Sequence, residues 1–360
     1  TGDIINKVTA AFFNLNAANT NDEMQSLAQE ISPLLTAHGN DIMMNKELFD
    51  RIKVVYESGI EGITTEQETL LTKTYKSFVR NGANLSENEK NRLREIDTLT
   101  AKLSLTFGEH VLKESNQFKL VLDNQKDLSG LPQSVIDAAS ITAKNEGHEN
   151  KWMFTLDYPS YIPFMTYAEN RSLREQMYRA FNSKGFQDND NNNTAVVRKI
   201  TKLRAERAQL LGYESHAHYV LEERMAESPS KVLDFLNEIQ SKAIRHAKNE
   251  FDELTAYAHQ LDQIKQIQKW DGTYYSEKLK KEKFAIDDEL LRPYFQLENV
   301  VDGVFKTAQK LFGITFKQRN DIDVYHEDVI TYEVLSDKNE HLAVFYADFF
   351  QDQAKDKEHG

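Results

Sequence analysis

Hydrophobic side chains in the first third of the chain recur every three or four residues, which is the spacing of an α-helix with one buried face. Polar residues of the kind that cap helices precede these stripes, and three of them are followed three residues later by glutamate, as in a capping box. The pattern therefore predicts a run of four helices, of which the fourth is long. The predicted caps are Thr20, Asn45, Thr65 and Ser86.

A short β region is predicted after these helices. Segments 118–123 and 152–156 are rich in aromatic and β-branched residues, which favours strands. Between them a helix is predicted over 132–144, with a proline as its first residue, where the missing N–H would be unbonded anyway. Pro159 and Pro163 are expected to frame a turn.

Helices return from Phe164, and the chain then ends in strands. Pro293 lies inside the last predicted helix and is expected to bend it, because proline lacks a backbone donor. The predicted helices cover 194–212, 228–261 and 287–312, and the predicted strands cover 314–316, 329–335 and 342–350. The fold class is therefore predicted to be mainly α with a small β-sheet. We expect a helical N-terminal subdomain over 1–112 and a helical body with small β elements over 113–360.

Composition places the chain among soluble globular proteins, with 40% hydrophobic and 28% charged residues. The net charge of −13 argues against a nucleic-acid partner, because such binding needs clustered Lys and Arg. No run approaches the roughly 20 apolar residues of a membrane span, so no membrane partner is expected. The absence of cysteine and of a signal-peptide pattern favours a cytoplasmic location.

Motif searches exclude several chemistries. The chain has no phosphate-binding glycine loop, no G-x-S-x-G elbow and no cysteine nucleophile. Ten histidines are present, but neither His148 nor His326, each followed by glutamate, completes the H-E-x-x-H pattern of a helical zinc site. His216 and His218 are two residues apart, which favours surface or packing roles. His326 is expected to end a strand.

Tyr346, Phe349 and Phe350 form an aromatic group in the last predicted strand. They are suited to lining a peptide cleft, but alternating residues of one strand also fill a core, and the core role is favoured.

Several longer segments carry a distinctive order of aromatic, charged and glycine residues. They are 75–82, 157–161, 203–207, 211–213, 219–225, 270–275, 290–300 and 311–315. Taken together and in this order, they resemble the thimet oligopeptidase and peptidyl-dipeptidase family of zinc metallopeptidases. The resemblance is closest to the bacterial peptidyl-dipeptidase branch, and it extends from Phe12 to Asp348.

The resemblance implies a largely helical, two-lobed shell around a deep channel that admits short peptides. It also implies a zinc cofactor, held by H-E-x-x-H and a further glutamate, with the motif glutamate acting as general base. Tyr346 and Asp348 match positions on a strand near the cleft and are the substrate-cleft candidates. The resemblance transfers no catalytic or metal-binding residue to this sequence.

Segment 351–360 departs from the family pattern, and the family's zinc motif lies beyond the strand that precedes Asp348. We therefore expect a chain that is incomplete at its start, stops before the zinc-binding helices, holds no zinc and hydrolyses no peptides. Truncation would leave apolar faces uncovered, and we therefore expect the chain to self-associate through them. The alternative is a non-catalytic helical scaffold or a peptide-binding relative. A hydrolase that uses scattered carboxylates or histidines has no support in the sequence.

Overall fold

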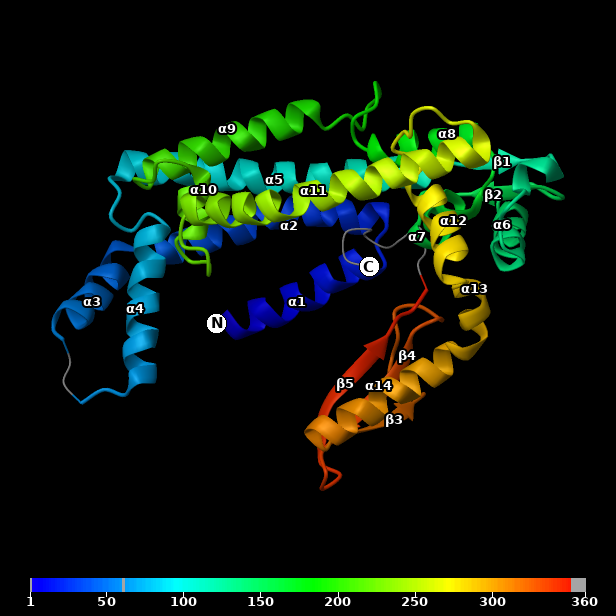
Figure 1. The fold of residues 1–360 in the computed structure, drawn as a ribbon. Helices are drawn as coiled ribbons and strands as arrows, with labels where there is room; N and C mark the ends of the chain where they lie inside the picture. Colours follow the sequence, from blue (N-terminus) through cyan, green and yellow to red (C-terminus); the bar gives the residue numbers. More distant parts are fainter. Residues whose placement is uncertain (1, 60–61, 351–360) are drawn as a thin grey trace. The chain divides into compact units, whose positions relative to one another are not determined.

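The computed structural model describes residues 2–59 and 62–350. Helices dominate these residues, and two small antiparallel sheets accompany them (Figure 1), which confirms the predicted fold class. The helices are α1 (Gly2–Ala18), α2 (Asp22–Met43), α3 (Lys46–Glu57), α4 (Thr65–Arg80), α5 (Glu87–Gln117), α6 (Gln133–Asn145), α7 (Tyr158–Tyr167), α8 (Arg171–Asn182), α9 (Thr194–Leu210), α10 (His216–Leu221), α11 (Pro229–Asp262), α12 (Gly272–Phe284), α13 (Asp288–Leu291) and α14 (Leu297–Phe312). The strands are β1 (Leu120–Leu122), β2 (Trp152–Phe154), β3 (Thr315–Arg319), β4 (Ile330–Leu335) and β5 (His341–Ala347), and 3-10 turns lie at η1 (Gln125–Leu128) and η2 (Arg292–Tyr294).

The chain forms two compact units, and each contains segments that are distant in sequence. The first unit comprises the described parts of 1–21, 115–183 and 250–360, and the second comprises those of 22–114 and 184–249. The expected subdomain boundary at residue 112 stays a prediction, as does the two-lobed channel. The ten residues 351–360, where we expected a departure from the family pattern, lie outside the described residues.

Local capping rules explain most helix starts in the second unit. Asn45 caps α3 by accepting from the Leu48 N–H, and Ser86 exchanges hydrogen bonds with Glu89 at the start of α5, as predicted. The capping box of α4 is one residue earlier than expected, because Thr64 and Gln67 form it. Adjacent threonines, each with an acceptor side chain three residues on, make these two positions equivalent in sequence.

The start of α2 also differs from the prediction. Thr20 was expected to cap this helix, but its hydroxyl donates to Asn16 Oδ1 at 2.9 Å, and α2 begins at Asp22. The preceding helix α1 supplies that acceptor, and sequence patterning had not predicted α1.

Ion pairs and stacked rings hold the second unit together. Arg92 pairs with Glu206, and Arg207 pairs with Asp97 at 2.8 Å, which joins the first part of α5 to the end of α9. Figure 1 shows the two helices side by side. In the α3–α4 hairpin, Tyr75 stacks on its neighbours in α3 with ring centroids 4.1–5.6 Å apart. The ion pairs and the stacked rings each join two helices, and capping and periodicity describe only one helix at a time.

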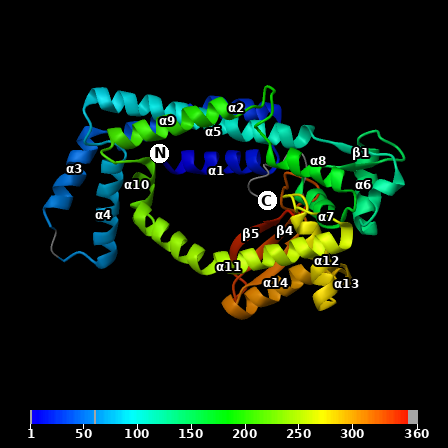
Figure 2. The same cartoon turned by 45° about the horizontal axis from the view of Figure 1, so that its top comes forward.

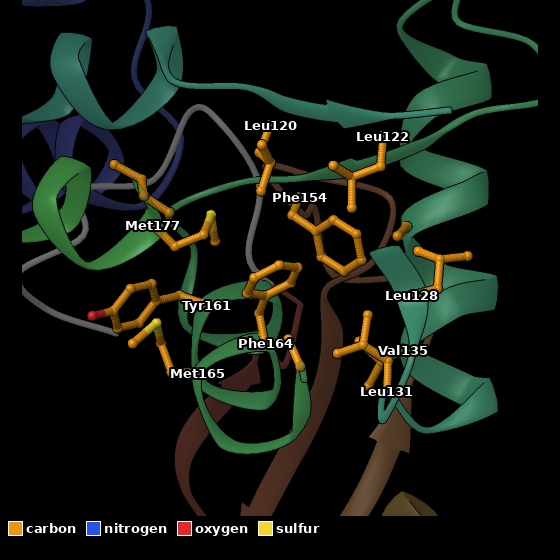
Figure 3. Close-up of a cluster of buried hydrophobic side chains, with 13 residues drawn as sticks. Leu120, Leu122, Leu128, Leu131, Val135, Phe154, Tyr161, Phe164, Met165 and Met177 are labelled. Atoms are coloured by element: carbon orange, nitrogen blue, oxygen red, sulfur yellow. The ribbon is translucent and has the colours of Figure 1, made fainter. Parts of the chain in front are cut away.

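The main hydrophobic core lies in the first unit, between the β1–β2 pair and helices α6, α7 and α8. Figure 3 shows Phe154 of β2 and Phe164 of α7 facing each other at its centre, with ring centroids 4.7 Å apart. Its buried residues are Leu120, Leu122, Leu128, Leu131, Val135, Ala139, Phe154, Leu156, Tyr161, Phe164, Met165, Ala168 and Met177.

Two proline predictions were wrong, for different reasons. Pro159 and Pro163 lie inside α7 instead of framing a turn. Pro159 occupies the first turn, where no donor is needed, and burial of Tyr161, Phe164 and Met165 offsets the bond that Pro163 cannot make. Pro293 does more than bend its helix: the chain there is divided into α13, η2 and α14.

The second sheet has the strand order β3-β4-β5, with antiparallel neighbours. Helix α14 lies along one face of it (Figures 1 and 2). The Phe305 ring of α14 stacks on Phe316 with centroids 4.0 Å apart and meets Tyr332 edge-on. The three strands predicted at this end of the chain are present, although β5 ends at Ala347, three residues before the predicted end at 350. β5 is left at one edge of the sheet.

Gly130 holds the loop before α6 against the end of α7, and its replacement is expected to be costly. Its φ is +86°, and an added Cβ would lie 2.3 Å from the Tyr167 carbonyl oxygen. We expect Gly130→Ala to lower the free energy of unfolding of the first unit by at least about 2 kcal/mol, through left-handed strain and displacement of backbone. Urea denaturation followed by tryptophan fluorescence measures this, because Trp152 and Trp270, the only two tryptophans, both lie in this unit. Gly272→Ala is the control, since nothing lies within 4 Å of its added Cβ; equal effects of the two changes would contradict the argument.

Candidate functional site

Strand β5 is an open edge in the part of the chain that the structure describes. It pairs with β4 alone, and its residues 341–346 are exposed while Ala347 is buried. An edge strand presents backbone donors and acceptors in a row, which is the arrangement that another extended chain can pair with. The two substrate-cleft candidates lie on this strand and directly after it.

Tyr346 lies on β5, with 43% of its surface exposed. Its hydroxyl donates to the Asp323 carbonyl oxygen at 3.3 Å. The core role favoured for the aromatic group was wrong, because Phe349 and Phe350 are also 44% and 54% exposed. Phe345 is the β5 residue whose ring lies near Phe305 of α14, so its neighbour Tyr346 points to the opposite face of the sheet. Phe349 and Phe350 lie beyond the end of β5 at Ala347.

Asp348 is positioned by the loop between β3 and β4. The Tyr325 hydroxyl donates to Asp348 Oδ2 at 2.9 Å, and the Tyr325 carbonyl oxygen accepts from Asn19 Nδ2 at 2.9 Å. With the Tyr346–Asp323 bond, the loop is therefore tied to β5 at two points. Sequence reasoning missed Tyr325, because 23 residues separate it from Asp348 and no local pattern joins them.

His326 lies in the same loop and not at the end of a strand, so that prediction was wrong. Its Nδ1 accepts from the Asp328 N–H at 3.3 Å. His216 and His218 lie on α10, where Ser215 Oγ is 2.9 Å from His218 Nδ1, and burial lowers the pKa of His216.

The residues that the structure describes do not form a zinc site. Across 2–59 and 62–350, no three His, Asp or Glu side chains are grouped so that they could hold a metal ion. The family's H-E-x-x-H pattern is likewise missing from the 360-residue sequence. The side chains described here therefore do not fit the zinc that the family resemblance implies.

A second group of charged residues lies where α8 meets the start of α12. Asp271 is fully buried and accepts from Arg171 Nη2 at 2.7 Å and Arg174 Nη2 at 3.1 Å. Arg174 is only 1% exposed, and its guanidinium lies 3.9 Å from the centroid of the Tyr274 ring. Burial alone would raise the pKa of Asp271, but hydrogen bonds from Arg171, the Gln268 N–H and Arg174 outweigh it and hold that pKa below its usual value. The aspartate is therefore ionised and paired at neutral pH.

No helix of the described residues is long and apolar enough to cross a membrane.

Comparison with known proteins finds relatives that align with nearly the whole chain. Dipeptidyl carboxypeptidase of Escherichia coli (strain K12) is 33% identical over 356 residues, which are 98% of this chain and 52% of that protein. Oligopeptidase A of Salmonella typhimurium is 32% identical over 358 residues, again 98% of this chain and 52% of the relative. A thimet-like oligopeptidase of Dictyostelium discoideum is 25% identical over 353 residues, which are 94% of this chain and 51% of the relative. The chain thus spans about half the length of these curated relatives. The dipeptidyl carboxypeptidase and the oligopeptidase A are matched at nearly the same identity. The assignment of this chain to the peptidyl-dipeptidase branch therefore stays a prediction.

The family model "Peptidase family M3" matches residues 164–359. We had expected the family pattern to fail from residue 351, and that expectation was wrong, because the match continues to 359. The matched segment includes α14, the three-stranded sheet and both cleft candidates. It covers more than half of the chain, which therefore belongs to peptidase family M3.

Proposed function

We propose that this chain contributes to a zinc-dependent metallopeptidase that hydrolyses short peptides. The match to peptidase family M3 over 164–359 carries the proposal. The names of the relatives, dipeptidyl carboxypeptidase and oligopeptidase A, support short peptides as its substrates. A cytoplasmic location is part of the same proposal, in line with the lack of cysteine and with an Arabidopsis thaliana relative, 30% identical, named probable cytosolic oligopeptidase A.

In this proposal β5 lies beside the substrate. An extended peptide placed antiparallel or parallel along its open edge would satisfy backbone groups that β4 does not pair. Tyr346 then presents a half-exposed ring to the peptide, and Asp348 is held in place by the Tyr325 hydroxyl. These two residues position substrate and do not supply the attacking group.

Hydrolysis by the 360 residues alone is proposed to be negligible. A zinc peptidase needs a metal held by protein ligands and a base beside the bound water. The sequence has no H-E-x-x-H, and the described side chains form no metal-binding group. The residues of this chain are therefore assigned to substrate positioning and to the scaffold.

The first test is the zinc content and peptidase activity of the purified 360-residue chain. We expect less than about 0.1 zinc per chain by elemental analysis after dialysis, and no cleavage of a short unblocked peptide. A family member that carries H-E-x-x-H is assayed in parallel as the positive control. Cleavage that a chelator abolishes would reveal a metal site within these residues and contradict the assigned inactivity.

The peptidase proposal itself is tested on the complete product of the gene. We expect hydrolysis of short peptides that a chelator abolishes and that added Zn²⁺ restores. A complete product that holds no zinc and cleaves no peptide would overturn the proposal.

A further inference from the structure

A polar cavity of about 430 Å³ lies within the first unit, where the start of α8, the end of α11 and helix α12 meet. This volume falls in the range of pockets that hold small ligands. None of its lining residues belongs to β5 or to the loop before β4. The charged and aromatic residues that line it are Glu169, Arg171, Arg174, Asp262, Tyr274, Tyr275 and Lys278.

The lining of the cavity offers cationic donors that the structure leaves available. Arg171 uses Nε and Nη2 on Asp271, while its Nη1 has no partner in the described structure. Lys278 Nζ lies 4.8 Å from the Tyr274 ring centroid, and no described carboxylate lies within ion-pair distance of it. Three cationic groups, with Arg174, thus stand against one buried carboxylate, that of Asp271. The net charge of these four groups is therefore positive.

The lining also offers two carboxylates, those of Asp262 and Glu169. Asp262 Oδ2 accepts from the Tyr275 hydroxyl at 2.9 Å; burial and this bond raise the pKa of Tyr275, so the tyrosine keeps its proton and acts as the donor. Glu169 Oε2 accepts from the Ser129 hydroxyl at 2.5 Å. Neither carboxylate has a Lys or Arg partner among the described residues, so both retain acceptor capacity for a cation.

Tyr274 supplies a third kind of group. It lines the cavity, is only 5% exposed, and its hydroxyl has no hydrogen-bond partner among the residues that the structure describes. The hydroxyl is not fully enclosed, so it is open to a hydrogen bond with an uncharged polar group of a ligand in the cavity.

We infer that this pocket binds a dipeptide as a zwitterion, with its carboxylate at Arg171 and Lys278 and its ammonium group at Asp262 and Glu169. A simple anion would meet two carboxylates, and a simple cation would meet three cationic groups, so a ligand that carries both charges fits best. Two residues extend to about 7 Å, which suits a cavity of this volume better than one residue does. The inference rests on the proposed function only in taking short peptides as the source of the dipeptide.

The test is calorimetric titration of the metal-free 360-residue chain with alanyl-leucine, N-acetyl-alanyl-leucine and alanyl-leucine amide. We expect saturable binding of the free dipeptide at millimolar concentration or below. Each blocked analogue is expected to bind about tenfold more weakly or worse, because blocking leaves charged protein groups without a partner. No saturable binding of the free dipeptide, or equal binding of all three, would overturn the inference. Loss on amidation without loss on acetylation would also overturn it, in favour of a plain carboxylate site.

Matched variants connect the binding to this pocket. Lys278→Gln is expected to weaken binding of the free dipeptide about tenfold and to change binding of the amide little. Lys281→Gln on the same helix is the control, since Lys281 pairs with Asp287 at 2.8 Å and does not line the cavity. Asp262→Asn tests the ammonium side while its amide oxygen still accepts from Tyr275. Equal effects of the Lys278 and Lys281 changes would overturn the assignment.

These binding measurements need neither zinc nor hydrolysis. A failed peptidase test with intact dipeptide binding would therefore refute only the proposed function, and the reverse result would refute only the pocket.

Discussion

Replacing Asp271 with alanine is expected to lower the free energy of unfolding of the first unit by about 3–5 kcal/mol, because it leaves a buried guanidinium without its counter-charge. Arg174 is 1% exposed, and its donors are satisfied by Asp271 and by three backbone carbonyl groups, those of Ala168, Glu169 and Trp270. The arginine therefore connects the α7–α8 loop to the start of α12. Removing the aspartate breaks the ion pair that, among the described residues, neutralises Arg174.

Tryptophan fluorescence during urea denaturation measures this loss, because Trp270 precedes the altered residue and both tryptophans lie in the first unit. The control is Glu175→Ala, which breaks the exposed i,i+4 pair with Arg179 and should cost no more than about 0.5 kcal/mol. The double variant Arg174→Met with Asp271→Leu should recover part of the loss, since a buried pair is often replaced by apolar side chains at little cost. A loss below about 1 kcal/mol for Asp271→Ala would show that solvent reaches Arg174.

The features that the sequence predicted are those that depend on neighbours within one turn or one strand. The Ser86–Glu89 box and the Asn45 cap involve residues three apart, so the bonds that start α5 and α3 are readable in sequence. The same local rules could not choose between Thr64 and Thr65. They also failed at α7, where tertiary burial of its apolar residues keeps Pro163 inside a helix.

Long-range pairs were beyond prediction for a simple physical reason. Asp271 is bonded to Arg171, 100 residues away, and the chain offers 44 Lys and Arg against 57 Asp and Glu. Only packing selects one pairing from so many. The segment around Trp270 and Asp271 was singled out in the sequence, but nothing local revealed its partners in α8.

The candidate site was predictable only in part. Tyr346 and Asp348 came from the family resemblance, and their environment came from the fold. Exposure of Tyr346 follows from the position of β5 at the edge of a three-stranded sheet. Asp348 is held in place by a hydrogen bond from the Tyr325 hydroxyl, and Tyr325 lies in a loop without regular structure. No periodic sequence pattern describes such a loop.

Phe164→Ala should destabilise the first unit by about 3–5 kcal/mol, because a fully enclosed aromatic ring leaves a cavity that its neighbours fill only partly. Phe164 is 0% exposed, and its ring meets that of Phe154 at 64° between the planes, with further core side chains around it (Figure 3). The loss is again read from urea denaturation by tryptophan fluorescence, since Trp152 packs against this same core.

Two variants separate enclosure from mere loss of an aromatic group. Phe164→Leu keeps most of the volume and is expected to cost less, about 1–2 kcal/mol. Phe284→Ala removes a ring that is 65% exposed in the same unit and should change the free energy of unfolding by less than about 0.5 kcal/mol. If Phe164→Ala cost no more than Phe284→Ala, the core would not be closed around α7, and Pro163 would lose the packing that explains its place inside that helix. The graded order alanine, leucine, wild type at position 164 thus tests the same tertiary burial that overrode the sequence rules at Pro163.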